Sequence, residues 1–258
     1  MKQITSRENP AVRQYTLLAA SRKARMEEQL FVTEGAKLTK EAVQTCSLKE
    51  LYVTETAIQK YDLDSLEEPV LISDGVAQKM SLTPAPQGIF GVFHQPQPYE
   101  IPLSVSQCYL VLSGLQDPGN VGTILRTAAA LGIGNVFLSP DCPDPYSPKV
   151  LRASMGGVFR LALETRETAE TITALDEAGV RVWAAALSPK AVPPQKAGLK
   201  AGSAVVIGNE GRGLAPEIAA LCKGIIQIPM APGNESLNAA MAAGILLWEM
   251  ARETEDSI

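Results

Sequence analysis

A continuous apolar run, CYLVLSGL at Cys108–Leu115, constrains the fold of this chain more than any other feature. Runs of this kind are typical of strands that are buried on both faces of a sheet. Comparable runs follow at Val136–Ser139, Val158–Leu163, Val180–Leu187, Ala204–Gly208 and Ile225–Ile228. Helical patterns separate most of them, which predicts an α/β fold with a parallel sheet covered on both sides. Such sheets bind ligands in the loops at the carboxyl ends of their strands.

The N-terminal part of the chain predicts a smaller α/β domain. Helices are expected over Asn9–Glu28 and Ala36–Thr45, and strands over Leu30–Thr33, Glu50–Val53, Val70–Ile72 and Gly88–Phe93. Prolines alternate with polar residues in the stretch His94–Ser106, which is typical of an extended connector. We therefore expect an α/β domain over residues 1–93, a linker over 94–106 and a second domain over 107–258.

Composition excludes several classes of function. The chain has a single histidine, His94, and four cysteines without metal-ligand spacing, at Cys46, Cys108, Cys142 and Cys222. This argues against a zinc site, and we expect no bound metal. No apolar run follows the first basic residues, and no stretch reaches the roughly 20 apolar residues of a membrane span. These features predict a cytoplasmic protein without a membrane anchor.

The first loop with unusual residues follows the apolar run, as LQDPGNVGTILR over Leu115–Arg126. Asn120 is expected to be the N-cap of a helix that ends before Gly132. The glycines of this loop would let a large ligand approach the backbone. Taken alone, the pattern is better explained by a capped helix with Arg126 on its surface.

The second loop, VIGNEGRGL over Val206–Leu214, places three glycines directly after a strand. Its spacing is neither that of a dinucleotide-binding loop nor that of a P-loop, and Glu210 would repel a triphosphate. The third loop runs from Ile228 to Asn238, and Ser236 stands where the N-cap of a last helix, Leu237–Arg252, is expected. A tight turn and a helix cap leave the Asn209–Glu210 pair and Asn238 unexplained.

In this order and spacing, the three loops resemble the three motifs of the SpoU (TrmH) family of SPOUT methyltransferases. The motifs read N-x-G-x-x-x-R, G-N-E-G-x-G-L and I-P-M with S-L-N, and the resemblance covers essentially all of residues 107–258. The segment Arg152–Gly156 also looks like an element of this family. ITSRENPAV and Phe31–Gly35 resemble, more loosely, the substrate-binding domain that precedes the catalytic domain in rRNA-directed members.

The resemblance implies a fold and a cofactor. It implies a parallel-sheet SPOUT domain with a deep trefoil knot, which general folding rules disfavour, and a homodimer formed through this catalytic domain. It implies S-adenosyl-L-methionine as the cofactor, with backbone contacts from Gly208, Ile228 and Leu237. Asn209, Glu210, Met230 and Asn238 would complete the wall of the cofactor pocket.

The resemblance also implies the reaction, which is methyl transfer to a ribose 2′-hydroxyl of RNA. The central role belongs to Arg126, with Asn120, Glu210, Ser236 and Asn238 around it. A guanidinium is a poor base because its pKa exceeds about 12. Arg126 either loses a proton with the help of the substrate phosphate, or stays charged and stabilises the developing alkoxide. The sequence leaves both roles open.

Charge distribution bears on the substrate. The net charge is −5, yet the first 25 residues hold six basic side chains against one acidic one. Such a segment is either a solvated helix face or a contact for phosphates. Together with Arg152, the candidate RNA contacts are Arg7, Arg13, Arg22, Lys23 and Arg25. A separate N-terminal domain favours a large structured RNA, with ribosomal RNA preferred over transfer RNA.

Two hypotheses from other classes remain open. The chain could be a non-catalytic RNA-binding or ribosome-assembly factor that kept the fold. The intact Asn120, Arg126 and Glu210 argue against this, and a titration with S-adenosylmethionine would decide. It could also be a dinucleotide-dependent enzyme, but no G-x-G-x-x-G follows the first strand of the second domain. A comparison of NAD and S-adenosylmethionine binding separates that hypothesis from ours.

Overall fold

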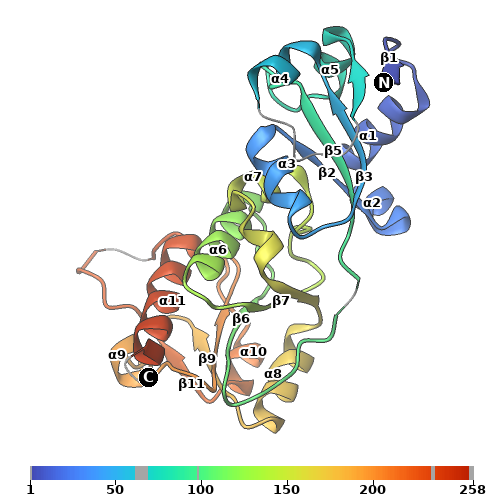
Figure 1. The fold of residues 1–258 in the computed structure, drawn as a ribbon. Helices are drawn as coiled ribbons and strands as arrows, with labels where there is room; N and C mark the ends of the chain where they lie inside the picture. The colour runs from blue at the N-terminus through green and yellow to red at the C-terminus, as the bar shows by residue number, and fades with distance from the viewer. Residues whose placement is uncertain (1, 62–68, 98, 234–235, 256–258) are drawn as a thin grey trace. The chain divides into compact units, whose positions relative to one another are not determined.

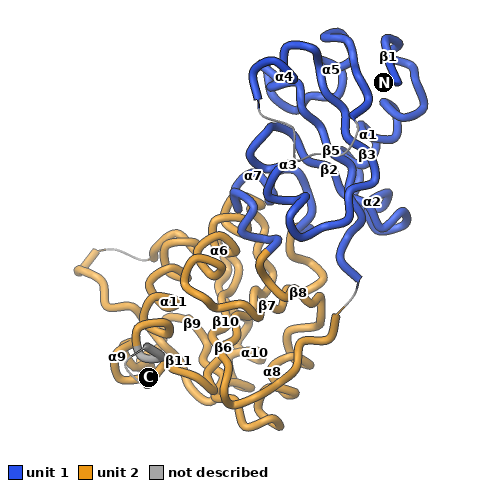
Figure 2. The backbone as a smooth tube through the Cα atoms, viewed as in Figure 1, with its two compact units in different colours: residues 1–97, 144–159 blue, residues 98–143, 160–258 orange. Residues whose placement is uncertain are grey.

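The computed structural model describes residues 2–61, 69–97, 99–233 and 236–255, and the chain forms two compact units (Figures 1 and 2). Unit 1 comprises Met1–Gln97 together with Asp144–Phe159, and unit 2 comprises Pro98–Pro143 together with Arg160–Ile258. The stretch 144–159 thus packs in unit 1, although the chain on either side of it belongs to unit 2. No sequence pattern indicated that residues 144–159 would pack in unit 1. The expected boundaries at 93, 94–106 and 107 stay a prediction.

Unit 1 is built on a mixed five-stranded sheet of order β1-β4-β3-β5-β2. Its strands are β1 (Gln3–Ile4), β2 (Leu30–Glu34), β3 (Leu48–Val53), β4 (Val70–Ile72) and β5 (Ile89–His94). β4 pairs in parallel with β1 and β3, whereas β5 pairs antiparallel with β2 and β3. The expected strands are therefore present, and the two-residue β1 was missed because so short a strand has no period to detect.

The helices of unit 1 are α1 (Pro10–Ala20), α2 (Arg22–Glu28), α3 (Ala36–Val43), α4 (Glu55–Lys60), α5 (Asp74–Met80) and α7 (Pro148–Ser154). The single helix expected over Asn9–Glu28 is wrong, because the chain turns at Ser21. Ser21 ends α1 with an extended backbone, and its side chain accepts a hydrogen bond from the backbone amide of Ala24 in α2. Ser21 is therefore the N-cap of a second helix, within the stretch whose apolar pattern had predicted one continuous helix.

Unit 2 contains a six-stranded sheet of order β11-β9-β10-β6-β7-β8, in which every pairing is parallel. The strands are β6 (Cys108–Leu112), β7 (Asn135–Leu138), β8 (Ala162–Thr165), β9 (Arg181–Ala185), β10 (Ser203–Ile207) and β11 (Gly224–Ile226). The expected parallel α/β sheet is confirmed. The strand expected from Val158 is wrong in its first half, where Gly157–Arg160 is a 3₁₀ helix. The apolar Val158 is buried in the stretch that packs in unit 1, so its hydrophobic character did not come from a strand.

Helices lie against both faces of this sheet (Figure 1). They are α6 (Pro118–Ala130), α8 (Thr168–Glu177), α9 (Pro194–Ala197), α10 (Pro216–Leu221) and α11 (Ala239–Glu255). α8 packs on the face that carries Tyr109 and Val111, and it also contacts α10. α6 and α11 pack against each other, and α11 also contacts β10. None of the described helices is long and apolar enough to cross a membrane.

Both expected N-caps in unit 2 are wrong. Asp117 begins α6 and its side chain accepts a hydrogen bond from the amide of Gly119, so Asn120 lies inside the helix and is buried. α11 begins at Ala239, and Asn238 rather than Ser236 accepts hydrogen bonds from the amides of Ala240 and Met241. Asp and Asn are as good as Ser at this position, and the sequence offered more than one candidate in each loop.

Candidate functional site

The loops that follow β6, β10 and β11 come together in unit 2. In a parallel sheet all strands point the same way, so the loops at their carboxyl ends share one edge. β10 pairs with both β6 and β9, and β9 pairs with β11, which places these loops on neighbouring strands. Of the third loop, Asn234 and Glu235 lie outside the described residues. The three sequence motifs therefore form one region of the folded chain.

A chain of hydrogen bonds joins one residue from each motif. The Asn238 side-chain amide donates to Asn120 Oδ1 at 3.0 Å, and the Asn120 amide donates to Glu210 Oε1, also at 3.0 Å. Asn120 is 90 positions from Glu210 and 118 positions from Asn238 in the sequence. Because Asn120 is buried in the first turns of α6, its amide needs both an acceptor and a donor, and the other two motifs supply them. Asn120 and Asn238 thus hold the loops together.

Glu210 is an acceptor at the centre of this network. Its carboxylate also accepts hydrogen bonds from the backbone amides of Gln116 at 3.0 Å and Asp117 at 3.1 Å. Burial opposes ionisation of this carboxyl group, but the hydrogen bonds from Asn120 and from the two amides outweigh it. The pKa of Glu210 therefore lies below its usual value, and the group is an anion at neutral pH.

Asn209 shapes the second loop. Its side-chain amide donates to the carbonyl of Gly114 at 2.8 Å, and its Oδ1 accepts from the amides of Gly211 and Arg212. The backbones of Asn209 and Gly213 also exchange two hydrogen bonds, which closes a tight turn. The Asn-Glu pair that a simple turn did not explain therefore has two structural roles, since Asn209 folds its own loop and Glu210 binds the first.

A cavity of about 460 Å³ lies beside these loops. It is within the range of roughly 300–1,000 Å³ that small-molecule and cofactor sites occupy. Six residues expected at the cofactor site line it, namely Gly208, Asn209, Glu210, Ile228, Met230 and Leu237, and so does Ser236. Asn120 and Asn238 are not in its lining. Among the described residues, no group of three or more His, Cys, Asp or Glu side chains could hold a metal ion.

Sequence reasoning missed part of the lining. The end of β9 contributes Ala185, Ala186 and Leu187, and α11 contributes Ala242 and Leu246. The β9 residues could have been found, because they follow a strand of the same parallel sheet and strand ends form the binding edge. The α11 residues carry no such signal, since alanine and leucine in an apolar helix predict only a core face.

Arg126 is part of neither the hydrogen-bond network nor the cavity lining. It is on the exposed side of α6, whereas the neighbouring Ile124 and Leu125 are buried. It makes no hydrogen bond or ion pair with any residue in the described ranges. An exposed guanidinium next to α11 is free to bind a ligand that comes from outside this chain.

The basic residues of the N-terminal segment differ in their surroundings. Arg7, Arg13, Arg22 and Lys23 are exposed. Arg7 donates to the carbonyl of Gly75, and Arg13 and Lys23 pair with Glu8 and Glu27 at the surface. The prediction that Arg25 contacts RNA is wrong, because its side chain is buried and ion-paired with Asp144. It was grouped with the others because charge alone does not reveal burial, and we do not retain it as an RNA contact.

Gly208 allows a direct test of the cavity. A Cβ atom there would lie 2.6–2.7 Å from backbone atoms of Gly213 and Leu214, which have no side-chain freedom to move away. We expect Gly208→Ala to displace the second loop and to lower the affinity for S-adenosylmethionine at least about tenfold, by isothermal titration calorimetry. Gly134→Ala is the matched control, since its Cβ would meet nothing within 4 Å. Equal affinities in the two variants would contradict the prediction.

Comparisons with known proteins identify the family of the chain. Residues 107–248 match the model of the SpoU rRNA Methylase family, and residues 9–91 match that of the MRM3-like substrate binding domain. The chain is 31% identical over 251 residues to the 23S rRNA (guanosine(2553)-2'-O)-methyltransferase RlmP of Bacillus subtilis, covering 97% of this chain and 99% of that protein.

Two solved structures are similar to this chain over nearly its whole length. An AdoMet-bound rRNA methyltransferase from Sinorhizobium meliloti superposes with a TM-score of 0.85 at 32% identity, covering 97% of both chains. A putative RNA methyltransferase of the TrmH family from Porphyromonas gingivalis superposes with a TM-score of 0.83 at 33% identity, covering 94% of this chain and 97% of that one. With its three motifs joined beside one cavity, and with these matches, the chain belongs to the SpoU rRNA methylase family.

Proposed function

We propose that this protein transfers a methyl group from S-adenosyl-L-methionine to a ribose 2′-hydroxyl of ribosomal RNA. The observation that carries the proposal is the chain of hydrogen bonds from Asn238 through Asn120 to Glu210, which holds the three family motifs together beside the cavity. Two of these motifs contribute residues to the lining of that cavity, among them Glu210, Ser236 and Leu237. The name of the Bacillus subtilis relative and the description of the family model at residues 107–248 favour rRNA over tRNA.

The cavity suits the cofactor in its chemistry as well as its volume. A folded-back S-adenosylmethionine needs backbone donors and acceptors for its adenine and apolar walls for its ring. The glycine-rich turn after β10 and the loop after β11 expose backbone groups, and Leu237, Leu246 and Ile228 supply apolar surface. When bound, the cofactor supplies an electrophilic methyl carbon. The Sinorhizobium meliloti structure with AdoMet bound supports this assignment.

The role of the chain's own residues is to align the ribose oxygen and to lower the cost of its charge. Methyl transfer is an in-line displacement, so geometry contributes much of the acceleration. We assign to Arg126 the binding of the substrate phosphate and the stabilisation of the alkoxide, since a guanidinium retains its proton. Glu210, Asn120 and Asn238 hold the loops, and the exposed Ser236 faces the cavity within reach of a ligand.

Two further features of the family belong to this proposal. We propose that unit 2 contains the trefoil knot that the resemblance to the family implies. We also propose a homodimer through unit 2. An apolar stripe on α11 supports it, where Met241, Ile245 and Trp248 are 62%, 40% and 59% exposed at helical spacing.

We also propose that the protein is located in the cytoplasm. Its four cysteines form no disulfide, which fits a reducing compartment.

The dimer can be tested at the apolar stripe. We expect Trp248→Glu to convert a dimer into a monomer in analytical ultracentrifugation, because a charge would replace a large apolar side chain at the interface core. Leu221→Glu, at an apolar residue that is 46% exposed at the end of α10, is the control and should leave the dimer intact. A wild-type monomer, or a dimeric Trp248→Glu variant, would refute the assignment of this surface.

The proposed function is tested by a nucleotide-resolution map of 2′-O-methylation in total RNA from cells with and without the gene. The expected result is one methyl group that disappears from rRNA and returns when the wild-type gene, but not the Arg126→Ala gene, is restored. Loss of a methyl group from tRNA instead would show that tRNA, not rRNA, is the substrate. An unchanged map, together with no binding of S-adenosylmethionine by the purified protein, would contradict the enzymatic function and favour an assembly factor.

A further inference from the structure

The stretch Asp144–Phe159 belongs to unit 1 by its packing, although the family models assign it otherwise. It lies outside residues 9–91, which match the substrate-binding domain, and inside residues 107–248, which match the methylase. The chain leaves β7, forms α7 within unit 1 and then returns to β8. A part of the methylase sequence is thus physically a part of the unit that is matched to substrate binding.

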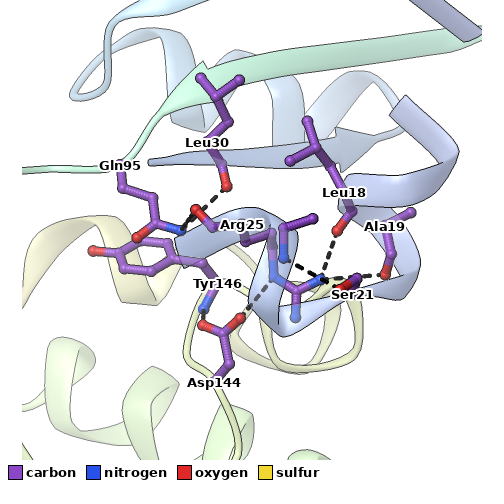
Figure 3. Close-up of polar contacts among 9 residues, drawn as sticks. Leu18, Ala19, Ser21, Arg25, Leu30, Gln95, Asp144 and Tyr146 are labelled. Atoms are coloured by element: carbon purple, nitrogen blue, oxygen red, sulfur yellow. Dashed lines mark hydrogen bonds and ion pairs between the residues drawn. The ribbon is translucent and has the colours of Figure 1, made fainter. Parts of the chain in front are cut away.

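A buried ion pair holds this stretch in place (Figure 3). Arg25 Nε lies 2.6 Å from Asp144 Oδ2, and the two side chains are only 4% and 10% exposed. The residues are 119 positions apart in the sequence. Arg25 belongs to α2, whose neighbours Arg22 and Lys23 are exposed. A charged pair at this depth is stable only if its remaining hydrogen-bonding groups are also satisfied.

Both partners do have further hydrogen bonds, as Figure 3 shows. The Arg25 Nη1 atom donates to the carbonyl of Leu18 at 2.6 Å. The second oxygen of Asp144 accepts from the backbone amide of Tyr146 at 2.8 Å. The side-chain amide of Gln95 donates to the backbone carbonyls of Arg25 and Leu30. Since each of these bonds is directional, they define one position for the start of the stretch.

Aromatic contacts define its other end. The ring of Phe31 in β2 lies 5.3 Å from that of Tyr146 and 5.6 Å from that of Phe159, and it stacks on Phe93 at 5.4 Å. Phe31 is completely buried. Tyr146 and Phe159 stand near the two ends of the stretch, so α7 between them is held at both sides against β2.

This docking determines which side of α7 faces solvent. Val150, Leu151 and Ser154 are buried, whereas Lys149 and Arg152 are exposed and lie three residues apart on one side of the helix. Neither basic side chain has a hydrogen bond or an ion pair with any residue that the structure describes. Two unpaired cations on the surface of a unit matched to substrate binding are suited to contact phosphates.

We propose that Lys149 and Arg152 bind phosphates of the RNA substrate as part of unit 1, and that Arg25 and Asp144 are positioning residues that hold them there. The proposal rests on the proposed function, because it assumes an RNA substrate. It differs from the charge-based prediction, since Arg25 acts on RNA only through α7. Lys149 and Asp144 are not among the residues that the family motifs single out.

The test measures the affinity for protein-free large-subunit rRNA over a range of salt concentrations, by filter binding. Each lost phosphate contact lowers the slope of log K against log salt by about 0.7–1. We expect Lys149→Ala and Arg152→Ala to show this decrease and to weaken binding about three- to tenfold at 0.15 M salt. Lys79→Ala is the control, because Lys79 is an exposed lysine in the last turn of α5.

The positioning role is tested by a double-mutant cycle. Asp144→Asn should lower the salt slope as Arg152→Ala does, and the double variant should show little further loss, although these side chains share no hydrogen bond or ion pair. Arg25→Lys, which keeps the charge but lacks the planar guanidinium, is a second route to the same result if Asp144→Asn does not fold. Glu50→Gln, which removes a carboxylate paired with Lys2 in unit 1, should leave the slope unchanged.

The outcomes are separable. Wild-type binding of rRNA with an unchanged slope in Arg152→Ala and Lys149→Ala overturns this inference and leaves the proposed function standing. Slopes that fall in those two variants but not in Asp144→Asn or Arg25→Lys overturn the positioning role. A wild-type protein that binds S-adenosylmethionine but no rRNA overturns the inference together with the rRNA assignment. Urea unfolding monitored by circular dichroism first shows that unit 1 is folded in every variant, since S-adenosylmethionine binding reports only on unit 2.

Discussion

Replacing Arg126 with lysine is expected to slow methyl transfer by about 100- to 1,000-fold, which is the usual cost of losing one group that stabilises a developing oxyanion. Lysine keeps the positive charge but cannot form the two parallel hydrogen bonds that a guanidinium makes with a phosphate. The affinity for S-adenosylmethionine should stay within about twofold of wild type, because Arg126 does not line the cavity. Single-turnover transfer to rRNA and cofactor titration measure the two quantities.

The matched control for this prediction is Arg166→Lys. Arg166 is a half-buried arginine of unit 2 that pairs with Glu164, and no part of the proposed mechanism uses it. Its variant should transfer methyl groups at the wild-type rate. Wild-type turnover in Arg126→Lys would contradict both proposed roles of Arg126. Rescue of Arg126→Ala by added guanidinium would show that the planar cation itself is the active group.

Replacing Arg25 with methionine is expected to lower the free energy of unfolding by about 3–5 kcal/mol. The variant leaves Asp144 buried without its cation, and the desolvated carboxylate is the main source of the cost. The double variant Arg25→Met/Asp144→Leu removes both charges and should recover most of the loss, because apolar groups of similar volume often replace a buried pair without penalty. Urea unfolding monitored by circular dichroism measures all three proteins.

The control for this prediction is Lys23→Met, which breaks an exposed i,i+4 pair with Glu27 on the same helix. Exposed pairs contribute little, so we expect a change within about 0.5 kcal/mol. The chain has two compact units, so its unfolding can show two transitions. In Arg25→Met the transition of unit 1 should shift to a lower urea concentration. If Arg25→Met were as mild as Lys23→Met, the ion pair would not be what holds the stretch 144–159 in place.

Local patterns were sufficient to predict most elements. Buried strands appear as apolar runs because both faces of a central strand are covered, and β4, β6, β7, β9 and β10 were located in this way. The exceptions were local ambiguities. Asp117 and Asn120 both qualify as the N-cap of α6, and Ser236 and Asn238 both qualify for α11. The hydrogen bonds across motifs decided between them, since Asn120 was needed inside the helix as the partner of Glu210 and Asn238.

The sequence by itself therefore determined the α/β architecture, the three motif loops and the family, because each depends on residues that are close together in the chain. Only the tertiary structure decided how distant residues act. It placed Arg25 in the interior, joined to Asp144 at a separation of 119 residues. It also moved α7 into the unit matched to substrate binding. Burial and long-range pairing depend on which surfaces meet after folding, and no local period in the sequence carries that information.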